Sequence, residues 1–131
     1  MSEGPPARAA GPSTTGSASL SITTARPTPG SVRVSVVGEI DMATAPRLRV
    51  ELLAVIAAAT ARTDIRVDLA GVAFIDAIGV GVLVRASEAA SRAGVGFCLE
   101  HPRGMVLRIL DVLDLVDTLV AAPEQPASPL C

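Results

Sequence analysis

The sequence contains no lysine, tryptophan or tyrosine, and it has a single histidine, His101. All 11 basic residues are therefore arginines, and 13 acidic residues outnumber them, which gives a net charge of −2. Nucleic-acid-binding domains are typically basic and stack bases on aromatic rings, so this composition argues against nucleic acid as a partner. One histidine also excludes a metal site built from several histidines, and a Ser-His-Asp triad would have to use His101. We expect His101 to lie on the surface at the end of a strand.

Cysteine is equally scarce, with only Cys98 and Cys131 present. Two cysteines cannot form the disulfide framework that stabilises small secreted domains. We expect Cys98 to be a thiol in a core strand. A disulfide between Cys98 and Cys131 is geometrically conceivable, because Cys131 lies in the predicted flexible tail, and redox activity of this pair stays open as the weaker interpretation.

Long apolar runs are absent as well. The longest, residues 52–59 and 77–84, are far shorter than the roughly 18 to 20 residues that cross a bilayer. Residues 1–17 contain no apolar block of the kind found in a secretory signal. The sequence therefore predicts a cytoplasmic protein without membrane insertion.

Composition divides the chain into three parts. Residues 1–17 are mostly Gly, Pro, Ala, Ser and Thr, which cannot bury enough apolar surface to offset the entropy of ordering them. We predict a disordered tail there, one folded domain over residues 18–121, and a flexible C-terminal tail over residues 122–131.

Within the domain, the spacing of apolar residues alternates between two and 3.6, which is typical of strands interleaved with helices. The pattern predicts strands near 20–23, 32–36, 65–69 and 95–99, and helices near 44–59, 77–92 and 103–113. The first two strands form an antiparallel pair, and residues 116–120 form a last strand or a helical turn. Thr44 is the expected N-cap of the first helix, while Leu107 is expected to face inward in the third. This order predicts an α/β fold, with a mixed four- to five-stranded sheet packed against three to four helices.

The most informative segment is the turn that leads into the second helix. A short apolar connection over residues 70–75 is expected between the strand and Asp76, whose carboxylate can cap the exposed N–H groups of the helix. Gly79 and Gly81 leave the first turn of this helix without side chains, which suits either close approach of a partner or close packing on the sheet.

Two nucleotide-binding interpretations of this turn are weak. A dinucleotide site would use Gly79, Gly81 and the acid Glu100, but Val84 occupies the position of the third glycine. A phosphate site at the helix N-terminus is disfavoured by Asp76 and by the absence of lysine. A surface that binds another protein is the remaining interpretation.

Two blocks of sequence, residues 37–45 (VGEIDMATA) and 68–83 (DLAGVAFIDAIGVGVL), resemble the STAS domain of bacterial anti-sigma factor antagonists. The resemblance implies a regulatory module that binds an anti-sigma factor, usually a serine kinase-like protein, and thereby releases a sigma factor to regulate transcription. It implies no catalysis and no cofactor. It also implies a partner-binding surface, which comprises Gly38, Asp41, Asp76, Ala77, Ile78, Gly79 and Val80.

The sequence departs from the family pattern at the position that matters for regulation. Relatives carry a phosphorylated Ser or Thr in an Asp-Ser-Ser/Thr-Gly turn, whereas here the turn reads Asp76-Ala77-Ile78-Gly79. Ile78 stands at the phosphosite and has no hydroxyl group, so the resemblance implies binding that is not switched by phosphorylation there. Whether Ile78 faces a partner or packs into its own core is open.

Two other classes of function remain as alternatives. A scaffold or accessory STAS module, in a stressosome-like assembly or on a lipid-transport ATPase, would also lack the phosphosite. An enzyme is disfavoured because the sequence offers no acid pair, metal cluster or activated nucleophile. Asp111, Asp114 and Asp117 recur at intervals of three, and we interpret them as a solvated face.

Overall fold

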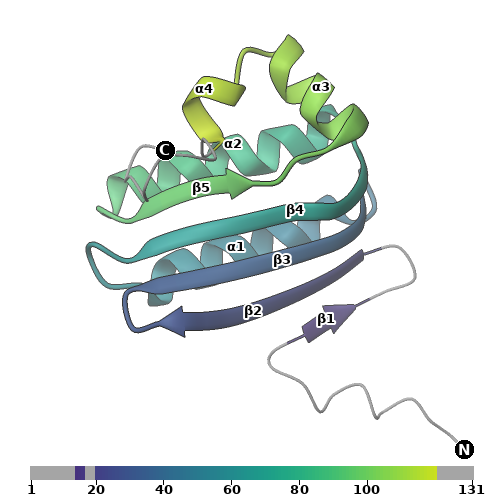
Figure 1. Ribbon diagram of the computed structural model, residues 1–131. Helices are drawn as coiled ribbons and strands as arrows, with labels where there is room; N and C mark the ends of the chain where they lie inside the picture. The colour runs from purple at the N-terminus through teal and green to yellow at the C-terminus, as the bar shows by residue number, and fades with distance from the viewer. Residues whose placement is uncertain (1–13, 17–19, 121–131) are drawn as a thin grey trace, which may run out of the picture.

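The structure, a computed structural model, describes residues 14–16 and 20–120 (Figure 1). A five-stranded sheet carries the strands in the order of the sequence. The strands are β1 (Thr14–Gly16), β2 (Leu20–Thr28), β3 (Ser31–Ile40), β4 (Asp64–Ile75) and β5 (Gly96–Glu100). The helices are α1 (Ala45–Ala58), α2 (Ala77–Arg92), α3 (Gly104–Val112) and α4 (Val116–Leu119). The predicted fold class is confirmed.

The strand directions place two connections at one end of the sheet. Strands β1, β2 and β3 are antiparallel neighbours, whereas β3, β4 and β5 run parallel. The register pairs Ile40 with Ile75, the last residues of β3 and β4. The turns that lead into α1 and α2 therefore leave the sheet side by side.

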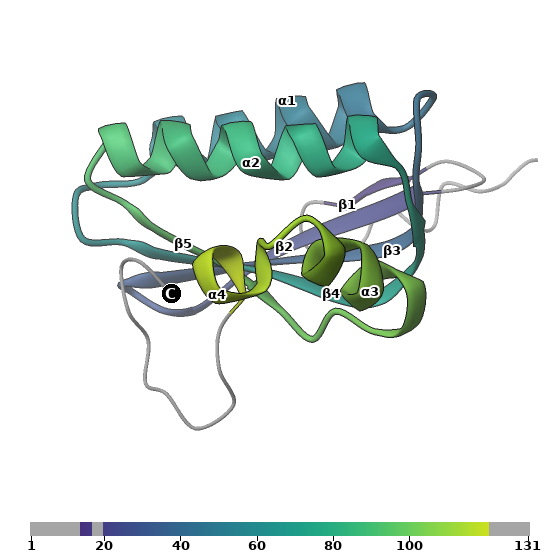
Figure 2. The same cartoon turned by 90° about the horizontal axis from the view of Figure 1, so that it is seen from above.

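The helices lie on both sides of the sheet (Figure 2). Helices α1 and α2 cover one face, while α3 and α4 lie on the other side, near β5. Alternate residues of β4, Ile65, Val67 and Leu69, are fully buried. The residues between them are only half-buried and belong to the opposite face. The main core is therefore aliphatic and lies between the sheet and the pair α1 and α2.

Helix α2 was fully predictable from local signals. Its bounds match the expected 77–92, and Gly94 follows it with a φ of +73°, a left-handed conformation that suits glycine beyond a helix end. Helix α3 also forms where expected, but Leu107 is 41% exposed, so the expectation that it faces inward is wrong. Val106 and Leu110 fill the buried side of α3 instead.

Strand β4 is longer than the sequence indicates. The expected connection over residues 70–75 is strand, and it stays paired with β3 up to Ile75. Two register shifts between β3 and β4 interrupt the alternation of buried and exposed residues, so the two-residue period is lost there. Val72 and Ile75 are buried at a spacing of three, which hides the strand from a periodicity argument.

The ends of the domain also differ from expectation. Residues 14–16, expected within a disordered tail, form β1 and pair with residues 21–23 of β2. At the other end both alternatives for residues 116–120 occur, because α4 forms a helical turn and Val120 then makes a parallel bridge to Leu99. The predicted tail at 122–131 lies outside the described residues, as does most of 1–17.

Candidate functional site

The turn at the start of α2 is organised by Asp76. Its carboxylate Oδ1 accepts a hydrogen bond from the Gly79 backbone N–H at 2.9 Å, as the sequence predicts for an N-cap. Its carbonyl accepts the Val80 N–H at 2.9 Å, and its own N–H donates to the Ile40 carbonyl at 3.2 Å. Asp76 thus fixes the first turn of α2 and ties it to the end of β3.

Gly79 faces the sheet rather than the solvent. A Cβ at this position would come within 2.6 Å of Ile40 Cγ2 and 2.8 Å of Ile75 Cγ1, closer than side chains approach one another. Both isoleucines are fully buried. Of the two interpretations of Gly79, the geometry favours packing on the sheet.

The two residues between Asp76 and Gly79 point outward. Ala77 is exposed, and Ile78 is 49% exposed although it is a large apolar side chain. The open question about Ile78 is therefore answered, because it does not pack into the core of its own chain. Val80, the next predicted partner-binding residue, is buried among core residues and supports this turn from within.

The neighbouring turn, between β3 and α1, is organised by Asp41. Asp41 Oδ1 accepts hydrogen bonds from the N–H groups of Ala43 at 2.9 Å and Thr44 at 3.1 Å. Thr44 stands at the N-cap, but its hydroxyl makes no bond to the helix N–H groups, so the expected capping role is wrong. The Thr44 hydroxyl instead donates to the Glu39 carbonyl at 2.7 Å and accepts the Asp41 N–H at 2.9 Å.

Gly38 shapes the end of β3 before this turn. Its φ is +120°, where L side chains are strained, and it adjoins one of the two register shifts between β3 and β4. The structure thus gives Gly38 and Asp41 backbone roles, and their predicted contact with a partner stays a prediction.

Sequence reasoning missed two exposed apolar side chains at this end of the sheet. Met42 lies between Asp41 and Thr44 and is 71% exposed, and Phe74 near the end of β4 is also exposed. Both belong to the segments that lead into the two turns. The signal that could have found Met42 is an unbranched apolar residue inside a polar turn, where it contributes nothing to a core.

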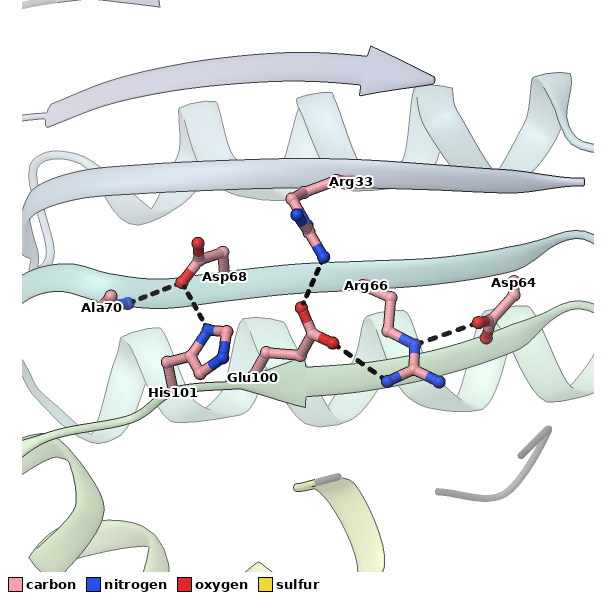
Figure 3. A network of polar contacts seen from close by, with 7 residues as sticks. All are labelled: Arg33, Asp64, Arg66, Asp68, Ala70, Glu100 and His101. Carbon is pink, nitrogen blue, oxygen red and sulfur yellow. Dashed lines mark hydrogen bonds and ion pairs between the residues drawn. The ribbon is translucent and has the colours of Figure 1, made fainter. Parts of the chain in front are cut away.

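The sheet face opposite α1 and α2 carries a polar network across β3, β4 and β5 (Figure 3). Glu100 accepts from Arg66 at 3.0 Å and from Arg33 at 3.4 Å, and Arg66 also bonds Asp64 at 3.0 Å. Burial acts to lower the pKa of Arg66, but the hydrogen bonds and charges of Asp64 and Glu100 outweigh it and raise the pKa. Arg66 therefore stays charged.

These contacts also bear on the roles expected for Glu100 and His101. Glu100, which a dinucleotide site would have used for a ribose, is held by two arginines. His101 is exposed, as predicted, and its Nδ1 lies 3.2 Å from Asp68 Oδ1. Asp68 Oδ1 in turn accepts the Ala70 N–H at 2.9 Å. We interpret this face as structural.

No other chemistry emerges from the described residues. Within 14–16 and 20–120, no group of three His, Cys, Asp or Glu residues could hold a metal ion. In the same part of the chain, no helix has both the length and the apolar character needed to span a membrane. Cys98 is fully buried in β5, as expected, but it is disulfide-bonded, so the expectation of a thiol there is wrong. Cys131 lies outside the described residues, and redox activity of the two cysteines stays a prediction. Asp111, Asp114 and Asp117 are exposed, as expected of a solvated face.

Comparison with known proteins gives a consistent answer. The profile of a family described as "Mlab, STAS domain" matches residues 23–121. Among curated proteins, the anti-sigma-B factor antagonist of Bacillus subtilis (strain 168) is 31% identical over 88 residues, which cover 67% of this chain and 78% of the relative.

Solved structures agree with this result. A crystal structure of an anti-sigma factor antagonist from Mycobacterium paratuberculosis is 30% identical, with a TM-score of 0.66 over 80% of this chain and 86% of that chain. The Bacillus anti-sigma factor antagonist SpoIIAA in its unphosphorylated form is 22% identical, with a TM-score of 0.62 over 79% of this chain and 89% of that chain. At that identity the second similarity shows the fold alone.

Proposed function

The chain belongs to the STAS domain family, and from this premise we propose that it is an anti-sigma factor antagonist. It binds an anti-sigma factor of the serine kinase-like type through the turn at the start of α2, and the bound anti-sigma factor releases its sigma factor. It acts in the cytoplasm, where transcription takes place, and it acts by binding rather than by catalysis. The names of the relatives support the general role.

The exposed Ile78 carries the proposal. A large apolar side chain at a helix start usually packs into the core, but here Gly79 rests on Ile40 and turns Ile78 outward. Ile78 is 49% exposed, so burying the rest of its side chain against a partner gains about 0.7 to 1.5 kcal/mol. The Asp76 cap and the contact of Gly79 hold the turn in place before binding, so little ordering entropy is lost.

Binding is tested with the variant Ile78→Asp. A buried charge at the centre of an interface costs about 2 to 4 kcal/mol, or roughly 30- to 1,000-fold in Kd. The variant will still fold, because a carboxylate in the first turn of a helix is favourable. We expect wild-type chain immobilised on a resin to capture an anti-sigma factor from the native cell, identified by mass spectrometry, and Ile78→Asp to lose it.

Val112→Asp is the matched control for this experiment. Like Ile78, Val112 is an exposed apolar residue of a helix: it is 76% exposed and lies in α3. It is far along the chain from the α2 turn. It should capture the anti-sigma factor as the wild type does. Equal capture by Ile78→Asp and wild type would move the interface elsewhere, and the absence of any anti-sigma factor would contradict the proposed function.

The absent hydroxyl makes a second prediction. Incubated with the captured anti-sigma factor and radiolabelled ATP, the wild type should take up no phosphate at residues 76–79, because neither Ala77 nor Ile78 has an acceptor oxygen. The variant Ile78→Ser restores the acceptor and should be labelled. A phosphate of nearly two negative charges should then weaken its binding to the anti-sigma factor.

Labelling of the wild type at this turn, located by peptide mapping, would show that regulation does not depend on position 78. An unlabelled Ile78→Ser chain in a complex that still forms would show that the partner is not a kinase.

An accessory role in an ATPase assembly is the second candidate. It is favoured by one observation, the absence of a hydroxyl group at position 78, which an accessory module would not need. In that case the captured protein would be a transporter ATPase, and size-exclusion chromatography of the native complex would show a large assembly. Capture of a free anti-sigma factor would exclude this alternative.

A further inference from the structure

Three residues on the outer side of α2 form a continuous stripe. Ile78, Gly81 and Arg85 are three and then four residues apart, a spacing that places them on one face of a helix. Ile78 and Arg85 are exposed, and Gly81 is half-buried between them. We call this stripe the α2 platform.

The two glycines of α2 serve different purposes. Gly79 is required by its contact with Ile40, but a Cβ at Gly81 would meet only one atom, Arg85 Nη1, at 3.8 Å. That distance is an ordinary van der Waals contact, so packing does not demand a glycine there. A glycine within a helix nevertheless costs about 0.5 to 1 kcal/mol relative to alanine.

Arg85 lies over this open position. Side chains on a helix lean toward its N-terminus, and the Arg85 guanidinium accordingly reaches back to Gly81, toward the α2 turn and away from Glu88. Gly81 is only three residues, or about 4.5 Å of helix rise, from Ile78. The guanidinium therefore reaches along the helix face that carries the exposed isoleucine, about one turn from it.

The charge on Arg85 has no counterpart within the described part of the chain. It makes no ion pair with any residue of 20–120, whereas Arg33 and Arg66 are both paired. The nearest carboxylate along the turn, Asp76, is engaged with the Gly79 N–H. An unpaired guanidinium beside an apolar side chain is complementary to a carboxylate beside an apolar contact.

We propose that the α2 platform selects an anti-sigma factor that offers a carboxylate to Arg85 next to the apolar contact that covers Ile78. The proposal rests on the proposed function and adds the chemistry of recognition. Gly81 has no side chain, so nothing at this position separates a partner segment from the helix between Ile78 and Arg85. The planar guanidinium of Arg85 can then bind the carboxylate with two hydrogen bonds.

The lack of lysine in this chain allows a specific test. The variant Arg85→Lys carries the only side-chain amine of the protein. A carbodiimide activates a carboxylate, an amine in direct contact displaces it to form an amide, and the carbodiimide leaves as a urea that has taken up the water. We expect Arg85→Lys, mixed with the anti-sigma factor captured by the wild type, to give a cross-linked product whose junction maps to position 85. Arg92→Lys, at the far end of the same helix, is the control and should give no junction at position 92.

Affinity supplies the second readout. Arg85→Glu should weaken binding to the same anti-sigma factor by about tenfold or more, while Arg92→Glu leaves it nearly unchanged. If Ile78→Asp abolishes binding but Arg85→Glu does not weaken it and Arg85→Lys does not cross-link, the α2 platform is overturned and the proposed function stands. If the wild type captures no anti-sigma factor, both are overturned.

Discussion

Gly79 and Gly81 lie two residues apart in α2, but replacing each with alanine should change the stability of the domain in opposite directions. We predict that Gly79→Ala lowers the free energy of unfolding by about 1 to 3 kcal/mol, because its Cβ would overlap the buried Ile40 and Ile75 side chains. Gly81→Ala should raise it by up to about 1 kcal/mol, because it removes a flexible residue from a helix and meets only Arg85. Urea unfolding of the two variants measures both effects.

The pair also separates folding from binding. Gly81→Ala leaves Ile78 and its turn intact, so only a modest loss of partner affinity is expected. Equal effects of the two alanines on stability would contradict the contact between α2 and the end of β3.

At the scale of the secondary-structure element, the first turn of α2 is stabilised by the Asp76 cap. We predict that Asp76→Ala costs about 1 kcal/mol of stability, because the Gly79 N–H loses its acceptor. Asp76→Asn keeps an acceptor oxygen and should lower the free energy of unfolding by only a few tenths of a kcal/mol, because its neutral amide interacts more weakly with the helix dipole. Thermal unfolding gives the cost, and amide hydrogen exchange at Gly79 should accelerate in Asp76→Ala alone. Unchanged exchange there would contradict the cap.

The elements differ in how far the sequence predicts them. The bounds of α2 follow from local sequence signals: the helical spacing of its apolar residues, the N-cap Asp76 and the glycine Gly94 beyond its end. The start of α1 is not, because Asp41 and Thr44 are both capping residue types and only the folded turn decides which oxygen reaches which N–H. The second half of β4 is hidden for a different reason, since its register shifts against β3 remove the period of two.

The sequence predicts where the candidate surface lies along the chain, but not which of its side chains are exposed to solvent. Motifs locate the α2 turn, yet the outward direction of Ile78 depends on the rotation of α2, which the contact of Gly79 with Ile40 sets. That contact joins residues 39 apart and has no local signature. Met42 differs from Ile78, because a local signal, an unbranched apolar residue inside a polar turn, could have located it.

At the scale of the whole molecule, the polar network on the sheet face opposite α1 and α2 joins β3, β4 and β5. The Glu100 and Arg66 side chains are each only 14% exposed, so breaking their pair leaves a largely desolvated charge. We predict that Glu100→Gln lowers the free energy of unfolding by about 1 to 2 kcal/mol. Glu88→Gln removes the same charge from an exposed position on α2 and should change it by less than about 0.5 kcal/mol.

Urea unfolding of the two glutamine variants in parallel checks this prediction. A shift for Glu88→Gln as large as that for Glu100→Gln would mean that net charge, rather than the network, controls the stability of the domain.

The α2 turn also bears on how such a protein changes over generations. Asp76 and Gly79 are held by hydrogen bonding and packing, but the side chains of Ala77 and Ile78 are exposed and lie outside the hydrophobic core. Replacement of either should therefore cost much less stability than a substitution in the core. A hydroxyl can be gained or lost at this position without an intermediate that fails to fold. Control by phosphate is thus a trait that evolution can add to or remove from this fold independently of the fold itself.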